Sequence, residues 1–498
     1  MKVFDVAIIG FGPTGAVLAN LLGQCGLDVL VLERESEAYH LPRAVHFDGE
    51  VMQILQWVGI ATALEPLTAL HPGMRFIDAQ GHLLLDWPRP QGEGPQGWRA
   101  NYRFHQPDLE RLLRDKLKTY ETIQVRTRCE VSLLEQQAAA VVLQFTDLSC
   151  GRVEHAHARY VVGCDGARSL VRRFVKTDME DLGFQERWLV VDVLLNQEKP
   201  ALGDHSIQYC DPARPATYVR GPGLRRRWEF SVKADEESDL VSQPDAVWRL
   251  LSPWLSKEEA TLERTAVYVF HSLIAAQWRN NRLLLAGDAA HQTPPFMGQG
   301  LCAGLRDVAN LYWKLALLCQ NKLSSSAAER LLASYETERR PNAHAYIATA
   351  VRLGGLINSC DSGAALRAAL PGADGSPRME SITVPLGPGI GGGGKAGILC
   401  AQPRLADGRL MDDVFAHRFI VIAVPDLAEC VVLSPDAVLL TTDSVPAASS
   451  ALARLGARAA VIRPDHYTLG TADTEGDLRA LIAQVLPAPV FIPQPQMA

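Results

Sequence analysis

The chain has 498 residues, of which 47% are hydrophobic and 21% charged, and its formal net charge is −7. A chain of this length exceeds what one hydrophobic core serves, so two or three domains are expected. The acidic balance argues against a general nucleic-acid binder. No uncharged apolar run approaches the roughly 18 residues of a membrane span, so we expect neither nucleic acid nor a membrane as a partner.

The ten cysteines are scattered and form no C-x-x-C pair. This spacing offers neither a dithiol redox centre nor a zinc site, so no metal is expected. Scattered thiols are typical of a reducing compartment. The first predicted strand begins at Val3, which leaves no room for a signal peptide. We therefore expect a cytoplasmic protein.

The N-terminal segment has the order of a dinucleotide-binding βαβ unit. An apolar strand over 3–9 runs into the Gly-x-Gly-x-x-Gly turn of 10–15. A helix of small apolar residues over 16–25 and a second strand over 29–32 follow, and the second strand ends at Glu33. Strand, glycine turn, helix, strand and terminal acid together make the complete fingerprint.

Each residue of this fingerprint has a physical role. Gly10 permits the tight turn, Gly12 lets the backbone approach a pyrophosphate, and Gly15 lets helix and strand pack closely. Glu33 stands where a carboxylate accepts hydrogen bonds from a ribose, and it would repel a 2′-phosphate. The fingerprint alone leaves FAD and NAD open.

The middle of the chain contains a second turn and then a region with a different hydrophobic pattern. A short strand over 160–162 is followed by Asp165-Gly166, with Ser169 as a helix cap. Beyond it, segments that alternate at period two between proline and glycine turns predict an antiparallel sheet whose face covers a cofactor. These segments are 187–194, 206–209, 217–220 and 227–232, with 74–77 and 83–86 as added strands.

Residues 283–300 combine a strand, an acidic turn and the start of a helix. Three leucines, 283–285, predict a buried strand that Gly287-Asp288 ends. Pro294-Pro295 forbids helix, and Gly298-Gln299-Gly300 opens an apolar helix that runs to about Cys319. This order suits a large cofactor laid across a helix N-terminus.

Glycine and proline become frequent after about residue 368, and Gly391–394 indicates a linker or exposed loop. Beyond it, strands and helices alternate, which predicts a small α/β domain. The predicted strands are 419–424, 437–441 and 459–462, and the predicted helices are 447–455 and 475–485.

Taken together, these motifs resemble the class A flavoprotein aromatic hydroxylases, the superfamily of para-hydroxybenzoate hydroxylase and phenol hydroxylase. The G-x-G-x-x-G, Asp-Gly (165–166) and Gly-Asp (287–288) motifs occur there in this order. Segment 41–48 looks like that family's arginine loop, and 104–110 looks like its Gln-x-x-Leu-Glu helix. Segment 278–314 is most similar to the 3-(3-hydroxyphenyl)propionate hydroxylase-like monooxygenases.

The resemblance implies FAD as cofactor, NADH or NADPH as co-substrate, and dioxygen. In the family, a flavin C4a-hydroperoxide transfers one oxygen to a phenolic ring. Asp165 belongs to a motif that serves both FAD and NAD(P)H, and Asp288 binds the ribityl chain. The residues implied at the cofactor are Gly10, Gly12, Pro13, Thr14, Gly15, Glu33, Arg34, Arg43, Gln106, Asp165, Gly287, Asp288, Pro295, Gly298, Gln299, Gly300 and Leu301.

On the substrate side, residues able to move a proton or hold an anion are the natural candidates. A tyrosine or histidine helps to deprotonate a phenol, and an arginine holds a carboxylate. The predicted catalytic residues are His46, Tyr209, Tyr218 and Arg220, with Pro295 stiffening the loop that faces the flavin ring. His291 is interpreted as a packing residue.

The resulting fold prediction is a Rossmann-type α/β FAD-binding domain with an antiparallel-sheet substrate domain and a small thioredoxin-like C-terminal α/β domain. The C-terminal domain lacks C-x-x-C, so its expected role is packing or homodimer formation. The predicted boundaries are 1–66, 98–185 and 266–367 for FAD, 67–97 and 186–265 for substrate, 368–395 for a linker and 396–498 for the C-terminal domain.

Two alternatives stay open at this point, and a third is disfavoured. A hydroxylase of larger aromatics, of polyketide or antibiotic type, would carry the same motifs around a different pocket. A non-catalytic flavoprotein would need no substrate pocket. A flavin halogenase is disfavoured because no Trp-x-Trp-x-Ile-Pro segment is present.

Overall fold

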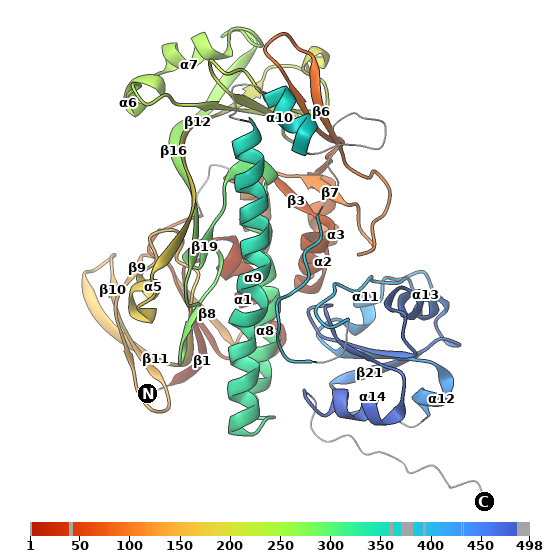
Figure 1. The fold of residues 1–498 in the computed structure, drawn as a ribbon. Coiled ribbons are helices and arrows are strands. Elements are labelled where there is room, and N and C mark those ends of the chain that lie inside the picture. Colours follow the sequence, from red (N-terminus) through yellow and green to blue (C-terminus); the bar gives the residue numbers. More distant parts are fainter. Residues whose placement is uncertain are drawn as a thin grey trace, which may run out of the picture.

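The computed structural model describes residues 2–38, 43–357, 362–369, 382–391, 395–429, 431 and 433–485. These residues form a mixed α/β protein with four β-sheets (Figure 1). Leu41 and Pro42 of the predicted arginine loop and most of the predicted linker lie outside the described residues. Among the described helices, none combines the length and apolar character needed to cross a bilayer.

The first sheet carries the dinucleotide fingerprint. Its central strands are parallel, because β1 pairs with β2 and β11, and β11 pairs with β18. Three predicted strands, 3–9, 29–32 and 283–285, are confirmed with these bounds. The strands are β1 (Val3–Ile9), β2 (Val29–Leu32), β8 (Ile123–Arg126), β9 (Cys129–Gln136), β10 (Val141–Asp147), β11 (Arg152–Gly163), β17 (Arg279–Asn280) and β18 (Leu283–Leu285).

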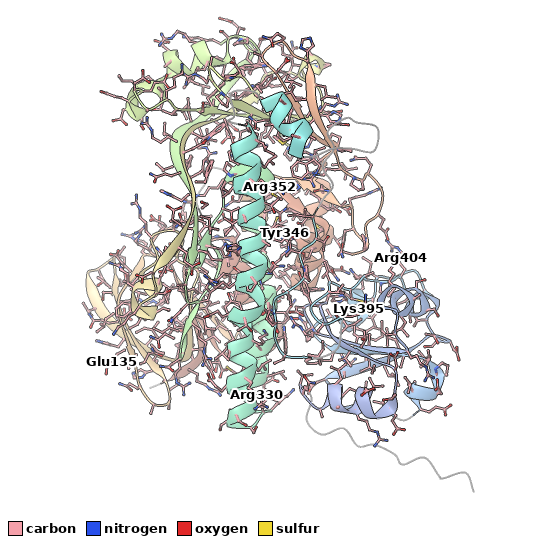
Figure 2. The ribbon with its side chains drawn as sticks, viewed as in Figure 1. Glu135, Arg330, Tyr346, Arg352, Lys395 and Arg404 are labelled. Carbon is pink, nitrogen blue, oxygen red and sulfur yellow. The ribbon has the colours of Figure 1, made fainter. Side chains whose placement is uncertain are left out.

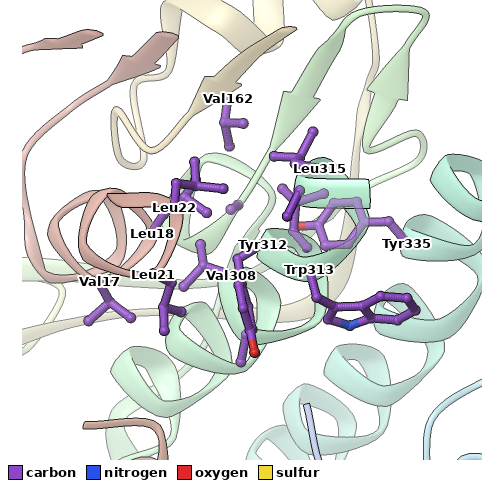
Figure 3. Close-up of a cluster of buried hydrophobic side chains, with 14 of the residues drawn as sticks. Val17, Leu18, Leu21, Leu22, Val162, Val308, Tyr312, Trp313, Leu315 and Tyr335 are labelled. Carbon is purple, nitrogen blue, oxygen red and sulfur yellow. The ribbon is translucent and has the colours of Figure 1, made fainter. Parts of the chain in front are cut away.

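Helices α1 and α8 cover this sheet and pack on each other. Figure 3 shows the leucines and valines of α1 meeting Val308, Tyr312 and Leu315 of α8, with Tyr335 of α9 behind them. Burying these apolar side chains removes them from water, which is the main stabilising term of the fold. The helices of this part are α1 (Pro13–Gln24), α2 (Gly49–Val58), α3 (Ala61–Leu64), α4 (Gln106–Leu117), α5 (Leu170–Val175), α8 (Gly300–Cys319) and α9 (Ser325–Ile357).

The second sheet confirms the predicted sheet in the middle of the chain. Its order is β19-β16-β12-β15-β14-β13-β5-β6, and only β13 and β5 pair in parallel. The 74–77 and 83–86 segments join it as predicted. Its strands are β5 (Gly73–Ile77), β6 (Leu83–Pro88), β12 (Met179–Leu195), β13 (Ser206–Tyr209), β14 (Ala216–Arg220), β15 (Arg225–Ser231), β16 (Ala260–Ala275) and β19 (His291–Gln292), with helices α6 (Ser238–Val241) and α7 (Pro244–Leu251) beside it.

A small sheet lies between these two, with β7 in the middle. It contains part of the arginine-loop segment, because β3 pairs antiparallel with β7. Residues 69–70, which the sequence assigns to the substrate domain, pair with β7 in this sheet instead. Its strands are β3 (His46–Asp48), β4 (Ala69–Leu70) and β7 (Asn101–Arg103).

The C-terminal segment forms a separate four-stranded sheet of order β21-β20-β22-β23, which lies beside α9 in Figure 1. The predicted strands and helices are found there, and the sequence missed β23 and the short helices α11 and α12. Its elements are β20 (Phe419–Ala423), β21 (Ala437–Thr441), β22 (Ala459–Ile462), β23 (Thr468–Ala472), α11 (Asp412–Phe415), α12 (Pro425–Ala428), α13 (Pro446–Leu455) and α14 (Glu475–Ile482).

A buried carboxylate fixes this C-terminal unit to the rest of the protein. Asp412 accepts hydrogen bonds from Gln53 Nε2 (2.8 Å), Trp57 Nε1 (2.6 Å) and His466 Nε2 (2.6 Å). The His466 ring also stacks on Trp57. Burial alone would raise the pKa of Asp412, but His466 and the hydrogen bonds from Trp57 and Gln53 hold it below its ordinary value. The interface therefore depends on a charged acceptor that both sides share.

We expect Asp412→Ala to loosen the C-terminal unit. The substitution leaves three buried donors without an acceptor, which costs about 2–4 kcal/mol. The expected result is a lower unfolding temperature and faster tryptic release of a C-terminal fragment. The control is Asp407→Ala, because Asp407 is exposed and its ion pair is with Arg409, two residues away. Equal unfolding temperatures for the two variants would contradict the docking role.

Candidate active site

The turn between β1 and α1 has the geometry of a phosphate-binding loop. Gly10 has φ +101°, and a Cβ there would lie 2.3 Å from the Cys164 carbonyl oxygen. A Cβ at Gly15 would lie 2.1 Å from the Gly10 oxygen, so both positions require glycine. Gly12 is different, because no protein atom lies within 4 Å of its Cβ position. Pro13 and Thr14 open α1 just beyond it.

Glu33 stabilises this loop from the end of β2. Its Oε2 accepts from the Phe11 amide at 2.6 Å, and its Oε1 accepts from the Glu35 amide at 2.9 Å. The carboxylate is half-buried beside the glycine turn, where the sequence placed it. Arg34 is exposed and pairs with Glu35 at 3.0 Å.

The arginine loop is held by its backbone from two sides. Gln106 Oε1 accepts from the Arg43 amide (3.1 Å) and the Ala44 amide (2.8 Å), while its Nε2 donates to Glu110. From the other side, Arg227 Nη1 donates to the Arg43 carbonyl at 2.7 Å. Gln106 therefore positions the loop on which Arg43 lies.

Asp165 caps a helix. Its Oδ2 accepts from the amides of Leu170 (2.6 Å) and Val171 (3.1 Å), and Ser169 Oγ donates to its Oδ1. Ser169 itself accepts from the Arg172 amide, so the predicted cap is confirmed. The geometry gives Asp165 a structural role at the start of α5.

Residues 287–301 bring the second cofactor motif to the glycine turn. Gly287 lies against Thr14, since a Cβ there would be 2.9 Å from Thr14 Oγ1. The next residue, Asp288, is exposed, and no donor among the described residues hydrogen-bonds its carboxylate. The surrounding protein raises the pKa of Asp288, while His291 and Arg43 oppose the shift. The charge of Arg43 thus acts on Asp288.

Beyond Asp288 the chain forms a tight turn before α8. Pro295–Met297 is one turn of 3-10 helix, and Gly298 (φ +63°) ends it beside His46 Nδ1. The side chain of Gln299 accepts from Arg306 at 2.9 Å, so it braces the helix start. Gly300 and Leu301 are the first residues of α8. His291 is buried, bonds Asp307 and lies on Trp278, which fits its interpretation as a packing residue.

A cavity of about 80 Å³ lies between this turn and the second sheet. Its walls are aromatic and apolar, with polar groups contributed mainly by the sheet and by the small sheet. The lining residues that matter here are His46, His71, Trp87, Arg89, Trp188, Ser206, Gln208, Thr217, Glu229 and 295–298.

Three of the predicted substrate-side residues lie on the opposite face of the second sheet. Tyr218 is buried against Trp228, with ring centroids 4.9 Å apart, and the Tyr209 hydroxyl accepts from Trp254 Nε1 at 2.9 Å. Arg220 pairs with Asp204 on the surface. Successive side chains of a strand point to opposite faces, so the cavity receives the neighbours of these residues instead. The structure therefore places Tyr209, Tyr218 and Arg220 away from this cavity, and each strand turns the preceding residue toward it.

The structure places His46 and Pro295 on the cavity, and it adds residues that the sequence did not single out. These are Gln208 and Thr217, which alternate with the predicted tyrosines, and Glu229, His71 and Arg89. Period-two alternation next to an aromatic residue was the available signal for Gln208, Thr217 and Glu229.

The two histidines of the cavity are neutral. Burial and the charge of Arg89 together lower the pKa of His46 to about 4, although a hydrogen bond to Asn101 Oδ1 (2.8 Å) opposes the shift. Burial and His46 hold the pKa of His71 well below its ordinary value. His71 Nδ1 accepts from the Gly73 amide, so its Nε2 carries the proton and faces Ser206 Oγ at 3.1 Å.

A second cavity, of about 430 Å³, adjoins the first. Trp87, Arg89 and Met297 line both, and the Arg89 guanidinium lies 4.0 Å from the Trp87 ring centroid. The larger cavity is bounded by α9, where Figure 2 labels Tyr346, and by the C-terminal unit. The stacked Trp87–Arg89 pair thus lies on the boundary that the small cavity shares with the larger one.

The residues present fit FAD. Gly12 leaves open space at the amide end of α1, where a diphosphate binds. Glu33 lies at the end of β2, and Asp288 has no donor of its own among the residues described. Within these same residues, no group of three His, Cys, Asp or Glu side chains is placed to hold a metal ion.

The chain belongs to the FAD binding domain family, which matches residues 3–350. It is 34% identical to the probable NADH-specific resorcinol 4-hydroxylase of Rhodococcus jostii (strain RHA1), over 99% of this chain and 97% of that protein. It is 38% identical to the 3-(3-hydroxy-phenyl)propionate/3-hydroxycinnamic acid hydroxylase 2 of Burkholderia vietnamiensis (strain G4 / LMG 22486), over 71% of this chain and 63% of that protein.

Among solved structures, the flavin-dependent monooxygenase PieE in complex with FAD and substrate superimposes with a TM-score of 0.80. It is 20% identical, and the match covers 98% of each chain, which shows a shared fold. The resemblance inferred from the motifs is thereby confirmed.

The glycine turn allows a test that separates cofactor binding from folding. We expect Gly12→Ala to fold normally, because φ is −72° and no protein atom crowds the new methyl group, yet to bind FAD at least about tenfold more weakly. Gly15→Ala should destabilise the protein itself, since its methyl group would meet the Gly10 oxygen. Flavin fluorescence titration and apo-protein melting measure the two effects. Loss of folding in Gly12→Ala would contradict this division.

The low pKa of His46 makes a second prediction. A group with a folded-state pKa of about 4 stays neutral above about pH 5, so His46 does not titrate in the working range. We expect His46→Gln to change the rate of turnover while leaving the shape of the pH–rate profile unchanged between about pH 6 and 9. A profile whose acid limb near pH 6.5 disappears in the variant would show that His46 titrates during turnover.

Proposed function

We propose that this protein is an FAD-dependent monooxygenase that hydroxylates a small phenol with NADH and dioxygen. The observation that carries the proposal is a cavity of about 80 Å³ between the 295–298 turn and the second sheet. The relatives' names support it, since one is called an NADH-specific resorcinol 4-hydroxylase and another a hydroxyphenylpropionate hydroxylase.

The overall reaction consumes a phenol, dioxygen, NADH and a proton and yields a ring with one more hydroxyl, NAD⁺ and water. When bound, FAD supplies the redox chemistry of this reaction. Gly10, Gly12, Gly15 and Glu33 would hold its ADP half. Asp288 would hold the ribityl chain, and the amide end of α8 would favour negative charge on the reduced ring.

The cavity walls suit a single ring. Its volume is far below the roughly 300–1,000 Å³ of sites for drug-sized ligands, which favours a small phenol over a polycyclic substrate. Trp87, Trp188 and Phe296 exclude water from the ring, which protects a reactive oxygen donor from decay. Neutral His46 would hydrogen-bond the substrate without taking its proton.

We also propose the division into domains that the sequence predicts. The C-terminal unit, 396–498, would be thioredoxin-like without C-x-x-C. Strand order and direction support this, because β20 pairs parallel with β21 and antiparallel with β22, and β22 pairs antiparallel with β23. Its buried contacts through Asp412 support a packing role. A cytoplasmic location is proposed because the cysteines are scattered along the sequence, which is typical of a reducing compartment.

The test is NADH oxidation by the FAD-loaded protein with three classes of substrate. These are dihydroxybenzenes such as resorcinol, hydroxyphenyl acids, and polycyclic phenols, each with mass detection of a product heavier by one oxygen. We expect coupled oxidation with single-ring phenols and little with polycyclic ones. NADH oxidation that no phenol accelerates or couples to oxygen insertion would favour the non-catalytic flavoprotein.

A further inference from the structure

Glu229 is a buried carboxylate on the wall of the small cavity. It lies in β15, where it pairs across the sheet with Thr217 of β14, which in turn pairs with Gln208 of β13. The three side chains share the face that lines the cavity. Glu229 is 9% exposed, and the cavity is the space onto which it opens. This row of three residues thus presents to a bound ring one charged group and two groups that can both donate and accept hydrogen bonds.

The two other members of this row already use their donors within the protein. Thr217 Oγ1 donates to Gln208 Oε1 at 2.7 Å, and Gln208 Nε2 donates to the carbonyls of Ala216 (3.1 Å) and Tyr209 (3.4 Å). None of these three hydrogens therefore points to Glu229. In the part of the chain that the structure describes, no donor hydrogen-bonds the Glu229 carboxylate.

The nearby arginines, Arg227 and Arg264, form their closest ion pairs with Asp192 and not with Glu229. Arg227 donates to Asp192 through Nε (2.7 Å) and Nη2 (3.2 Å), and Arg264 Nη2 lies 2.6 Å from the same carboxylate. Arg227 Nη1 donates to the Arg43 carbonyl and stays 3.7 Å from Glu229 Oε1. Glu229 thus has a cation close enough to stabilise its charge and too distant to fill its hydrogen-bonding capacity.

A buried carboxylate with unfilled acceptor capacity calls for a donor from the ligand. A phenolic hydroxyl is the donor that the proposed substrate supplies. Resting on the proposed function, we propose that Glu229 is a catalytic residue that binds the substrate's phenolic hydroxyl and takes its proton. The phenol O–H bond breaks, the proton joins a Glu229 oxygen, and the electron pair stays on the phenol oxygen, where it enriches the ring.

The electrostatic setting supports such a transfer. Burial raises the pKa of Glu229, and the charge of Arg227 opposes the shift, which moves the group toward the range of phenols. Other strands and the far wall also present titratable or charged groups to this region. They are Asp192 on β12, Arg227 on β15, Arg264 and Tyr268 on β16, and Arg89, His46 and His71 across the cavity.

The test uses the FAD-loaded protein and 4-nitrophenol, whose phenolate absorbs visible light and whose neutral form does not. At a pH where the free probe is mainly neutral, wild-type protein should bind it with a phenolate band. Glu229→Gln should bind FAD normally, give no such band, and hydroxylate an accepted phenol at least about tenfold more slowly. An undiminished band or hydroxylation rate in Glu229→Gln would overturn the assignment.

Two further variants keep the test decisive. Glu259→Gln removes a half-exposed carboxylate paired with Lys199 outside the cavity, and it should match the wild type in both readouts. If Glu229→Gln does not fold, Glu229→Asp keeps the charge beside Arg227 but withdraws the acceptor. It should weaken the band and slow hydroxylation, and unchanged values would overturn the assignment. The band is measured without turnover, so a wild type that shows it but hydroxylates no phenol would refute the proposed function alone.

Discussion

The buried polar side chains of α8 are the constraint around which the rest of the molecule is arranged. Arg306, Asp307, Asn310 and Lys314 lie on this helix and are all buried. An uncompensated charge in a protein interior costs several kcal/mol, so each needs a partner from another element. Those partners come from every major part of the fold: Asp48 and Glu50, Gly287 and His291, Glu338 and Arg339 of α9, and Asp465 of the C-terminal unit.

This requirement explains why the C-terminal unit is part of the fold. Burial lowers the pKa of Lys314 to about 8. The charge on its buried partner, the Glu338 carboxylate, would also be unfavourable without a second cation. Arg463, from the turn between β22 and β23, supplies it, and together with Lys314 it brings the pKa of Glu338 to about 2 despite burial. Tyr467 from the same turn donates to Glu50, which pairs with Arg306. The C-terminal unit thus completes the charge balance behind the helix that begins at the flavin side of the site.

The sequence predicted where strands and helices begin and end better than it predicted which face of each strand points inward. Glycine turns and apolar strands are local signals, so β1, β2 and β18 were found with their bounds. Period two identified β13 and β14, but it does not say which face is inward when both faces are buried. Tyr218 is predicted at the substrate because its hydroxyl can move a proton, whereas the structure turns Thr217 toward the cavity. The 33-residue helix α9 was missed because its buried face includes Glu338 and Arg339, whose partners are distant in sequence. Asp412 is likewise far in sequence from its partners Gln53 and Trp57, so the sequence did not reveal that it fixes the C-terminal unit to the rest of the protein.

One buried pair connects the cofactor loop to the substrate wall. Asp192 neutralises Arg227, and Arg227 both holds the Arg43 carbonyl and stands beside Glu229. Because all three contacts converge on one guanidinium, a shift of the arginine loop changes the field at Glu229, and a proton arriving on Glu229 weakens its attraction for Arg227. One guanidinium therefore hydrogen-bonds the backbone of the arginine loop and contributes its charge to the field at Glu229. A lysine at 227, with a single rotatable ammonium, would not hold these partners together.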